Sequence, residues 1–184
     1  MNTRALFAGR WNQITTVVDA VSQIGLHVVI FGERGVGKSS LANIIRPVLD
    51  VLDQQTPHIV VRVNAHQSDT FASVWVKALD EVQWVEDKPQ VGFNRTPGKV
   101  PVRLRSAMGL SDDLTIDDIR RTLAQLPDSV FVIDEFDRLP RRHAAQFTDL
   151  IKTLSDSAVP STLILVGVAE TVEGLIKDLS LIHI

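Results

Sequence analysis

The sequence contains no cysteine among its 184 residues. Disulfide bonds, thiolate metal sites and cysteine nucleophiles are therefore excluded. No apolar run approaches the roughly 20 residues that a membrane-spanning helix needs, and the N-terminus has no long apolar segment. We therefore expect a cytoplasmic protein with no membrane partner.

A strong excess of charge of one sign is also missing. The formal net charge is -3, which argues against a protein that binds nucleic acid mainly through a broad positive field. The five histidines have none of the short spacings typical of metal ligands. With 45% hydrophobic residues the chain can form one sizeable core, and we expect a single domain over residues 1–184.

Four short apolar runs occur along the chain, with helical patterns around them. The runs are HVVIF (27–31), HIVVRV (58–63), VFVI (130–133) and TLILV (162–166). Apart from a first polar residue, three of them are continuously apolar, as strands covered on both faces should be, whereas Arg62 marks the second as an edge strand. Apolar residues recur at helical spacing within 14–21, 71–82 and 147–154. The pattern predicts an α/β fold of three layers, a parallel sheet with helices on both faces.

Other local signals concern helix ends and loops. Thr115 with Asp118 resembles a capping box, and it predicts a helix that runs to Leu126. Pro47 predicts a kink or an early break near Arg46. Prolines and glycines interrupt any period within 86–111, so we expect a long irregular surface excursion there. Its basic residues could contact the phosphates of a nucleic acid, and a solvated loop is the alternative; they are Arg95, Lys99, Arg103 and Arg105.

The strongest chemical signal is GERGVGKS at residues 32–39, which fits the pattern G-x-x-x-x-G-K-[ST] without a departure. The motif follows an apolar run and opens a helical stretch. Glycines let such a loop curl until its backbone N–H groups converge on phosphate oxygens. We expect Lys38 to neutralise the β- and γ-phosphates of a nucleotide and Ser39 to ligate Mg²⁺. The expected nucleotide contacts are Gly32, Glu33, Arg34, Gly35, Val36, Gly37, Lys38, Ser39 and Ser40.

Acidic residues directly follow the apolar run at 130–133. Ligands of parallel sheets lie beyond the carboxyl ends of the strands, so Asp134 should lie at the same edge as the phosphate loop. Asp134 is then placed to hold Mg²⁺, and Glu135 to polarise a water for attack on the γ-phosphate. The predicted catalytic residues are Glu135 and Lys38. For Asp137 and Arg138 a surface ion pair is the simplest expectation.

Together these segments resemble the core of a AAA+ ATPase. They are FAGRW (7–11), GERGVGKSS, VRVNAHQSDTFASVW, VIDEFDRL and LILVGVAET. The sequence is similar to bacterial AAA+ proteins related to origin-recognition initiators and to transposition and secretion ATPases. The resemblance implies a P-loop NTPase fold of the AAA+/ASCE type, Mg²⁺ and ATP as ligands, a homo-oligomer, and a nucleic-acid or protein partner. It also implies that Ala8, Gly9 and Arg10 lie beside the adenine, with Gly9 as a simple turn residue the alternative.

The sequence departs from the AAA+ pattern near its end. The fourth core strand usually ends in a polar sensor residue, but LILVGVAET offers Gly167, with Glu170 and Thr171 beyond. The pattern then continues with an arginine finger, a fifth strand and a helical lid. Here the last arginine is Arg142, so we expect a C-terminally truncated core without the lid that binds ATP better than it hydrolyses it. Residues 181–184 form either a short fifth strand or an apolar tail.

Two classes of function fit these motifs. The first is an ATPase that couples ATP binding and hydrolysis to the remodelling or loading of a nucleic-acid or protein partner. The second is a nucleotide-gated interaction or signalling module with little turnover. The adjacent Asp134 and Glu135 favour the ATPase.

Overall fold

The computed structural model describes residues 11–52, 59–88, 98–168 and 180–183. The helices are α2 (Trp11–Val21), α3 (Lys38–Leu52), α4 (Phe71–Asp80), α5 (Leu104–Ala107), α6 (Ile116–Leu123) and α7 (Arg141–Asp156), with a 3-10 turn η1 (Phe136–Arg138). The strands are β1 (Val28–Gly32), β2 (Ile59–Asn64), β3 (Gln83–Lys88), β4 (Gly98–Arg103), β5 (Ser129–Asp134), β6 (Ser161–Val168) and β7 (Ser180–His183). None of the helices in these ranges is long and apolar enough to cross a bilayer.

A five-stranded parallel sheet forms the centre of the molecule, in the order β2-β5-β6-β1-β7. The four apolar runs of the sequence are its strands β2, β5, β6 and β1, so that prediction is confirmed. β2 lies at one edge, as Arg62 indicated. The backbone of Ser180–His183 pairs with β1 at the other edge, which makes this segment a fifth strand of the sheet.

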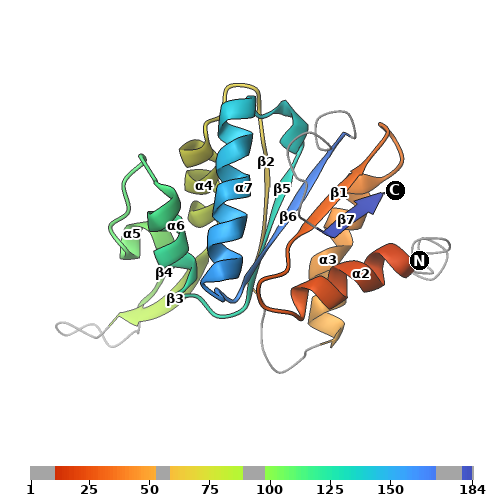
Figure 1. The fold of residues 1–184 in the computed structure, drawn as a ribbon. Helices are drawn as coiled ribbons and strands as arrows, with labels where there is room; N and C mark the ends of the chain where they lie inside the picture. The colour runs from red at the N-terminus through yellow and green to blue at the C-terminus, as the bar shows by residue number, and fades with distance from the viewer. Residues whose placement is uncertain (1–10, 53–58, 89–97, 169–179, 184) are drawn as a thin grey trace.

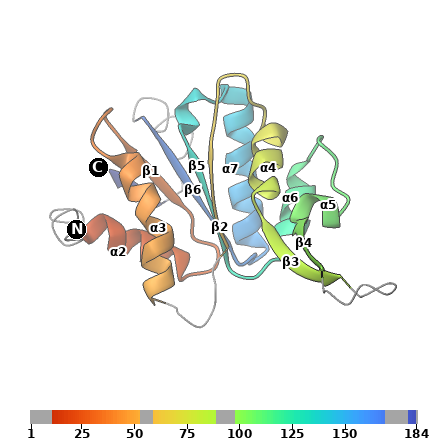
Figure 2. The same ribbon diagram turned by 180° about the vertical axis from the view of Figure 1, so that it is seen from behind.

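Helices cover both faces of the sheet, so the predicted three layers are confirmed (Figure 1). Side chains alternate along a strand. Val28 and Ile30 therefore pack with α2 and α3, whereas Val29 and Phe31 belong to the larger cluster under α4, α6 and α7. Figure 2 shows α2 and α3 with the whole molecule seen from behind.

The larger cluster is built around Trp75 of α4, which is fully buried. Its ring lies 5.3 Å from that of Phe131 in β5 and 6.2 Å from that of Phe147 in α7. Large rings contribute much of the buried apolar area of a core, and tilted and stacked ring pairs such as these two are favourable. These contacts fix α4 and α7 against the strand that ends at Asp134.

The segment 86–111 differs from the expected irregular excursion. β3 and β4 pair antiparallel from Gln83↔Arg103 to Lys88↔Gly98 and form a two-stranded ribbon that projects away from the sheet (Figures 1 and 2). Pro101 fits in it because each strand of a two-stranded ribbon has a free edge, where a missing N–H costs no ladder bond. The sequence prediction read proline and glycine as breaks and did not allow for an edge.

Two helix predictions also need correction. α3 runs through Pro47 to Leu52, so the early break expected near Arg46 does not occur. Pro47 is exposed, so the backbone carbonyl that loses its partner can be hydrated, while Leu41 and Ile45 hold the helix on the sheet. The capping box at Thr115 and Asp118 is confirmed, but α6 ends at Leu123, because the next residues form tighter i→i−3 bonds.

His27, the residue directly before β1, hydrogen-bonds to β6 and offers a way to test how β1 is held in the sheet. Its side chain is 2% exposed, and Nδ1 accepts a bond of 3.0 Å from the backbone N–H of Leu163 in β6. Burial lowers the pKa of His27 to about 4. The unfolded chain therefore binds a proton between pH 6.5 and 4 that the folded chain does not, and stability must fall as the pH falls through this window.

We expect the free energy of unfolding to drop by up to about 3 kcal/mol from this group between pH 7 and pH 4. The measurement is denaturant unfolding across that range. The matched control is His27→Asn, which keeps an acceptor near the Leu163 N–H and has no proton to bind in this window. An equal pH dependence in both proteins would contradict the assignment to His27.

Candidate functional site

The loop between β1 and α3 curls around a concavity at the start of α3. Gly35 and Gly37 adopt positive φ angles of 82° and 87°, which residues other than glycine adopt only at a cost in conformational energy. Lys38 folds back over the loop, and its Nζ donates to the carbonyl oxygens of Gly32 at 2.8 Å and Glu33 at 2.6 Å. The first turn of the helix and the lysine thus lie together, in an arrangement suited to an anion.

The acidic pair lies at the carboxyl end of β5. Asp134 is the last residue of that strand and is 3% exposed. Its Oδ1 accepts a bond of 2.8 Å from the backbone N–H of Glu135, and its Oδ2 pairs with Arg62 of β2. Glu135 has a left-handed backbone, with φ 55° and ψ 32°, which is uncommon for a residue with a side chain.

Phe136 fixes the turn that follows this acidic pair. It is 2% exposed, and its ring meets that of Phe147 edge-on at 5.4 Å. The buried ring anchors η1 on α7 and so stabilises the left-handed conformation of Glu135. Backbone strain of this kind, of order 1 kcal/mol or more, persists only where the surrounding structure enforces it.

One cavity of about 270 Å³ joins the loop and the acidic pair. The structure thus brings together Lys38, Ser39, Asp134 and Glu135, which the sequence assigned to one site from two distant segments. The lining residues are Arg34, Gly35, Lys38, Ser39, Asp134, Glu135, Asp137, Arg138, Gly167 and Val168. Ala8, Gly9 and Arg10, assigned to the adenine, lie outside the described residues, as do Glu170 and Thr171.

The tip of β6 shows why glycine stands where AAA+ proteins usually have a polar sensor. A Cβ at Gly167 would lie 3.2 Å from both the backbone nitrogen and Oδ1 of Asp137. Oδ1 of Asp137 also accepts a bond of 3.2 Å from the backbone N–H of Val168. Asp137 therefore takes the space at this corner of the cavity that a side chain at position 167 would need.

Arg138 does not pair with Asp137, so that expectation is wrong. Its guanidinium lies 3.1 Å from Oε1 of Glu135, and the two side chains are 50% and 36% exposed. Asp137 is instead bound to the backbone of β6. An ion pair that exposed contributes little to stability, so Glu135 can leave it at small cost.

Arg62 is the site residue that the sequence analysis did not assign. Its guanidinium donates to Oδ2 of Asp134 and to Oδ1 of Asn43 in α3. The signal in the sequence was a charged residue within an apolar strand, which was interpreted only as the mark of an edge. The side chain contacts two other elements at the site.

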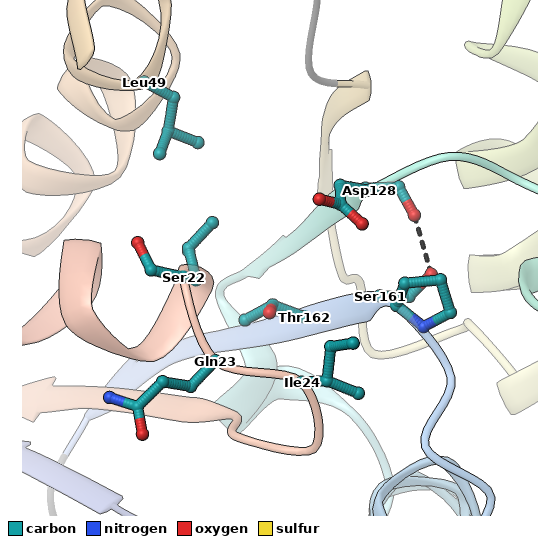
Figure 3. Close-up of a pocket in the computed structure, with 10 residues that line it drawn as sticks. Ser22, Gln23, Ile24, Leu49, Asp128, Ser161 and Thr162 are labelled. Carbon is teal, nitrogen blue, oxygen red and sulfur yellow. Dashed lines mark hydrogen bonds between the residues drawn. The ribbon is translucent and has the colours of Figure 1, made fainter. Parts of the chain in front are cut away.

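A second cavity, of about 290 Å³, lies at the opposite ends of the strands (Figure 3). The turn after α2 and the starts of β5 and β6 line it, with Ser22, Gln23, Ile24, Asp128 and Thr162 among its residues. Its charged lining residue is an acid, and no curled glycine loop borders it. It therefore does not suit a phosphate group, whatever its size.

The sequence model of the AAA domain family matches residues 24–175. No curated protein matches the sequence. Among solved structures, the chain is similar to the CDC6P protein of Pyrobaculum aerophilum, with a TM-score of 0.60 and 17% identity over 95% of this chain and 45% of that one.

Two other solved structures come from Aeropyrum pernix. The ORC1 protein in complex with DNA gives a TM-score of 0.55 and 15% identity, over 92% of this chain and 41% of that one. The ORC2 protein, in its ADPNP-ADP complexes, gives 0.60 and 14%, over 100% of this chain and 48% of that one. These likenesses establish the fold, and the chain spans less than half the length of each. Since the family match covers most of the sequence and the fold agrees with it, the chain belongs to the AAA domain family, with the three-layer P-loop fold of AAA+ NTPases.

Proposed function

We propose that this chain binds Mg-ATP in the cavity between residues 32–39 and the tip of β5, and hydrolyses it. The observation that supports this best is the meeting of Lys38, Ser39, Asp134 and Glu135 at one cavity. A cation, a hydroxyl, a buried carboxylate and a second, partly exposed carboxylate are the groups that phosphoryl transfer to water uses.

Lys38 and the loop would hold the phosphates. The lysine now binds the carbonyl oxygens of Gly32 and Glu33, so it already lies along the loop and needs to turn only its ammonium toward a bound phosphate. The N-terminus of α3 adds a partial positive charge. Arg34, Val36 and Ser40 belong to the same proposed contact surface as the three glycines of the motif.

The donor set fits Mg²⁺, which prefers oxygen ligands and keeps several waters. Ser39 would offer its hydroxyl and Asp134 its carboxylate. Among the described residues no group of three or more histidine, aspartate and glutamate side chains forms a metal cage, which suits an ion held partly by the phosphates of its nucleotide. When bound, Mg²⁺ would neutralise charge that develops on the phosphates.

Glu135 would act on the attacking water. It lies one residue beyond Asp134 on the left-handed turn, so the two carboxylates reach the cavity from one strand end. To accept a proton Glu135 must leave Arg138, and the exposure of that pair makes the exchange cheap. Arg138 would then be a free cation beside the cavity.

A remodelling or loading role, a homo-oligomer and a nucleic-acid or protein partner remain proposals drawn from the family. Of the basic residues expected to contact a nucleic acid, Arg95 lies outside the described residues and Arg103 is exposed. Arg105 pairs with Asp80 at 2.9 Å and also with Asp112, so its charge is already compensated. The alternative is a nucleotide-gated module with little turnover, and the acidic pair favours hydrolysis over it.

Lys38→Ala tests the phosphate site. The variant should bind ATP tens to a hundred times more weakly, the scale of one lost charged hydrogen bond. Calorimetric or fluorescence titration measures this, with circular dichroism to verify the fold. Lys152→Ala, which removes an exposed lysine from α7, is the matched control and should bind as the parent does. Equal affinity in the folded Lys38 variant would rule out the site.

Glu135→Gln tests the base. The amide cannot accept the proton, so turnover should fall by roughly a hundredfold or more while Mg-ATP binding persists. Phosphate release per bound nucleotide is the measurement, and Asp149→Asn on the exposed face of α7 is the control. Parent-level hydrolysis by the variant would place the base elsewhere. A parent that binds Mg-ATP without turnover would favour the nucleotide-gated module.

A further inference from the structure

Arg62 joins the two elements that carry the proposed Mg²⁺ ligands. Along β2, Val60 packs on the α3 side of the sheet, whereas Val61 and Val63 pack on the other. Arg62, two residues after Val60, therefore projects toward α3. Asp134 lies on the same side, because Val132 two residues before it packs with α3 as well.

The guanidinium bridges these elements. One nitrogen donates to Oδ2 of Asp134, and another donates to Oδ1 of Asn43. Asn43 lies four residues after Ser39 on α3, so the two are one helical turn apart on one face. Arg62 thus links α3, which carries the proposed ligand Ser39, to the carboxylate of the other proposed ligand, Asp134.

Asp134 has both carboxylate oxygens engaged. Oδ1 accepts from the backbone N–H of Glu135 at 2.8 Å, and Oδ2 pairs with Arg62. The Asp134 side chain is 5% exposed, and that of Arg62 is 31% exposed. A cation in direct contact with a buried carboxylate repels a divalent cation at the same group, and the repulsion is strong where water is largely excluded.

We infer that Arg62 is a positioning residue that competes with Mg²⁺ for Asp134, so that Mg-ATP must displace it from the carboxylate. The inference rests on the proposed Mg-ATP site. Without the nucleotide Arg62 compensates the buried charge and holds α3 and β5 together. Arg62 also borders a separate cavity of about 450 Å³ at this edge of the sheet, whose lining includes Glu81, Lys77 and His66.

Displacement couples the nucleotide site to the sheet edge. β2 is an edge strand, and Arg62 is its side-chain link to Asn43 and Asp134. A released Arg62 would move its charge away from Asp134, and so away from the phosphate cavity that Asp134 lines. The free surface at this edge would then differ between the nucleotide-free and Mg-ATP forms.

Arg62→Gln is the decisive variant, because glutamine keeps amide donors and loses the charge. Binding of a fluorescent, non-hydrolysable ATP analogue is titrated with Mg²⁺ at fixed nucleotide. We expect the half-saturating Mg²⁺ concentration to fall by about tenfold, as the repelling charge is gone. Arg62→Lys keeps the charge and should stay near the parent value.

Arg46→Gln is the matched control. Arg46 of α3 donates to the backbone carbonyl of Val60, so it links the same helix and strand without touching Asp134. It should leave the half-saturating Mg²⁺ concentration unchanged. Thermal unfolding adds an independent reading: Arg62→Gln should melt lower than the parent without ligand, because the buried Asp134 loses its counter-charge, and should gain more from Mg²⁺ with the analogue.

The outcomes separate the two levels of the argument. A parent that binds no analogue, with or without Mg²⁺, overturns the proposed function and this inference together. A parent that binds it with Mg²⁺, beside an Arg62→Gln variant whose Mg²⁺ requirement is unchanged or higher, overturns the competition alone and leaves the nucleotide site standing. A tenfold decrease restricted to Arg62→Gln supports it.

Discussion

A buried carboxylate at the end of a parallel strand is the constraint on which this site depends. The side chain of Asp134 is 5% exposed, and an unpaired charge at such a place is very costly. The charge is compensated by Arg62 from the neighbouring strand and by a hydrogen bond from the N–H of Glu135. Both partners depend on the sheet, since the register that sets Asn64 beside Asp134 also sets Arg62 within reach.

The frame around this carboxylate is held by apolar packing rather than by charge. Trp75, Phe131 and Phe147 join α4, β5 and α7, and Phe136 extends the cluster to the turn after Glu135. Close-packed interiors change little in response to small forces at their surface. This packing fixes the end of β5, whereas the charged side chains beyond it are held by ion pairs and hydrogen bonds.

The sequence was sufficient for the fold class and for the meeting of the loop with the acidic pair. The hydrophobic period and the glycine-rich motif can each be recognised in a short stretch of sequence. The rule that the carboxyl ends of parallel strands lie at one edge of the sheet supplied the remaining step. Arg62 could not be assigned to the site in the same way, because its partners Asn43 and Asp134 are 19 and 72 residues away in the sequence. No sequence pattern indicates contacts between residues at these separations.

The ribbon and the tip of β6 were missed for related reasons. Pro101 and Gly98 suggest irregular chain until the antiparallel partner is known, since only pairing tells which edge is free. The glycine at 167 reads as a lost sensor until Asp137 is seen in contact with it. In both cases the deciding neighbour is distant in sequence and is brought close by tertiary packing.

The charged groups of the site are satisfied by neighbouring residues of the chain. Lys38 binds loop carbonyls, Glu135 pairs with Arg138, and Asp134 pairs with Arg62. A ligand therefore gains only the difference between its contacts and those it replaces. The three contacts that a ligand would replace differ in cost. The ion pair of Glu135 with Arg138 is exposed and weak, and Lys38 need only turn its ammonium. The ion pair of Asp134 with Arg62 compensates a buried carboxylate. In the proposed binding of Mg-ATP, the pair of Arg62 with Asp134 therefore costs the most to break, because only there must an incoming charge replace one that the fold itself requires.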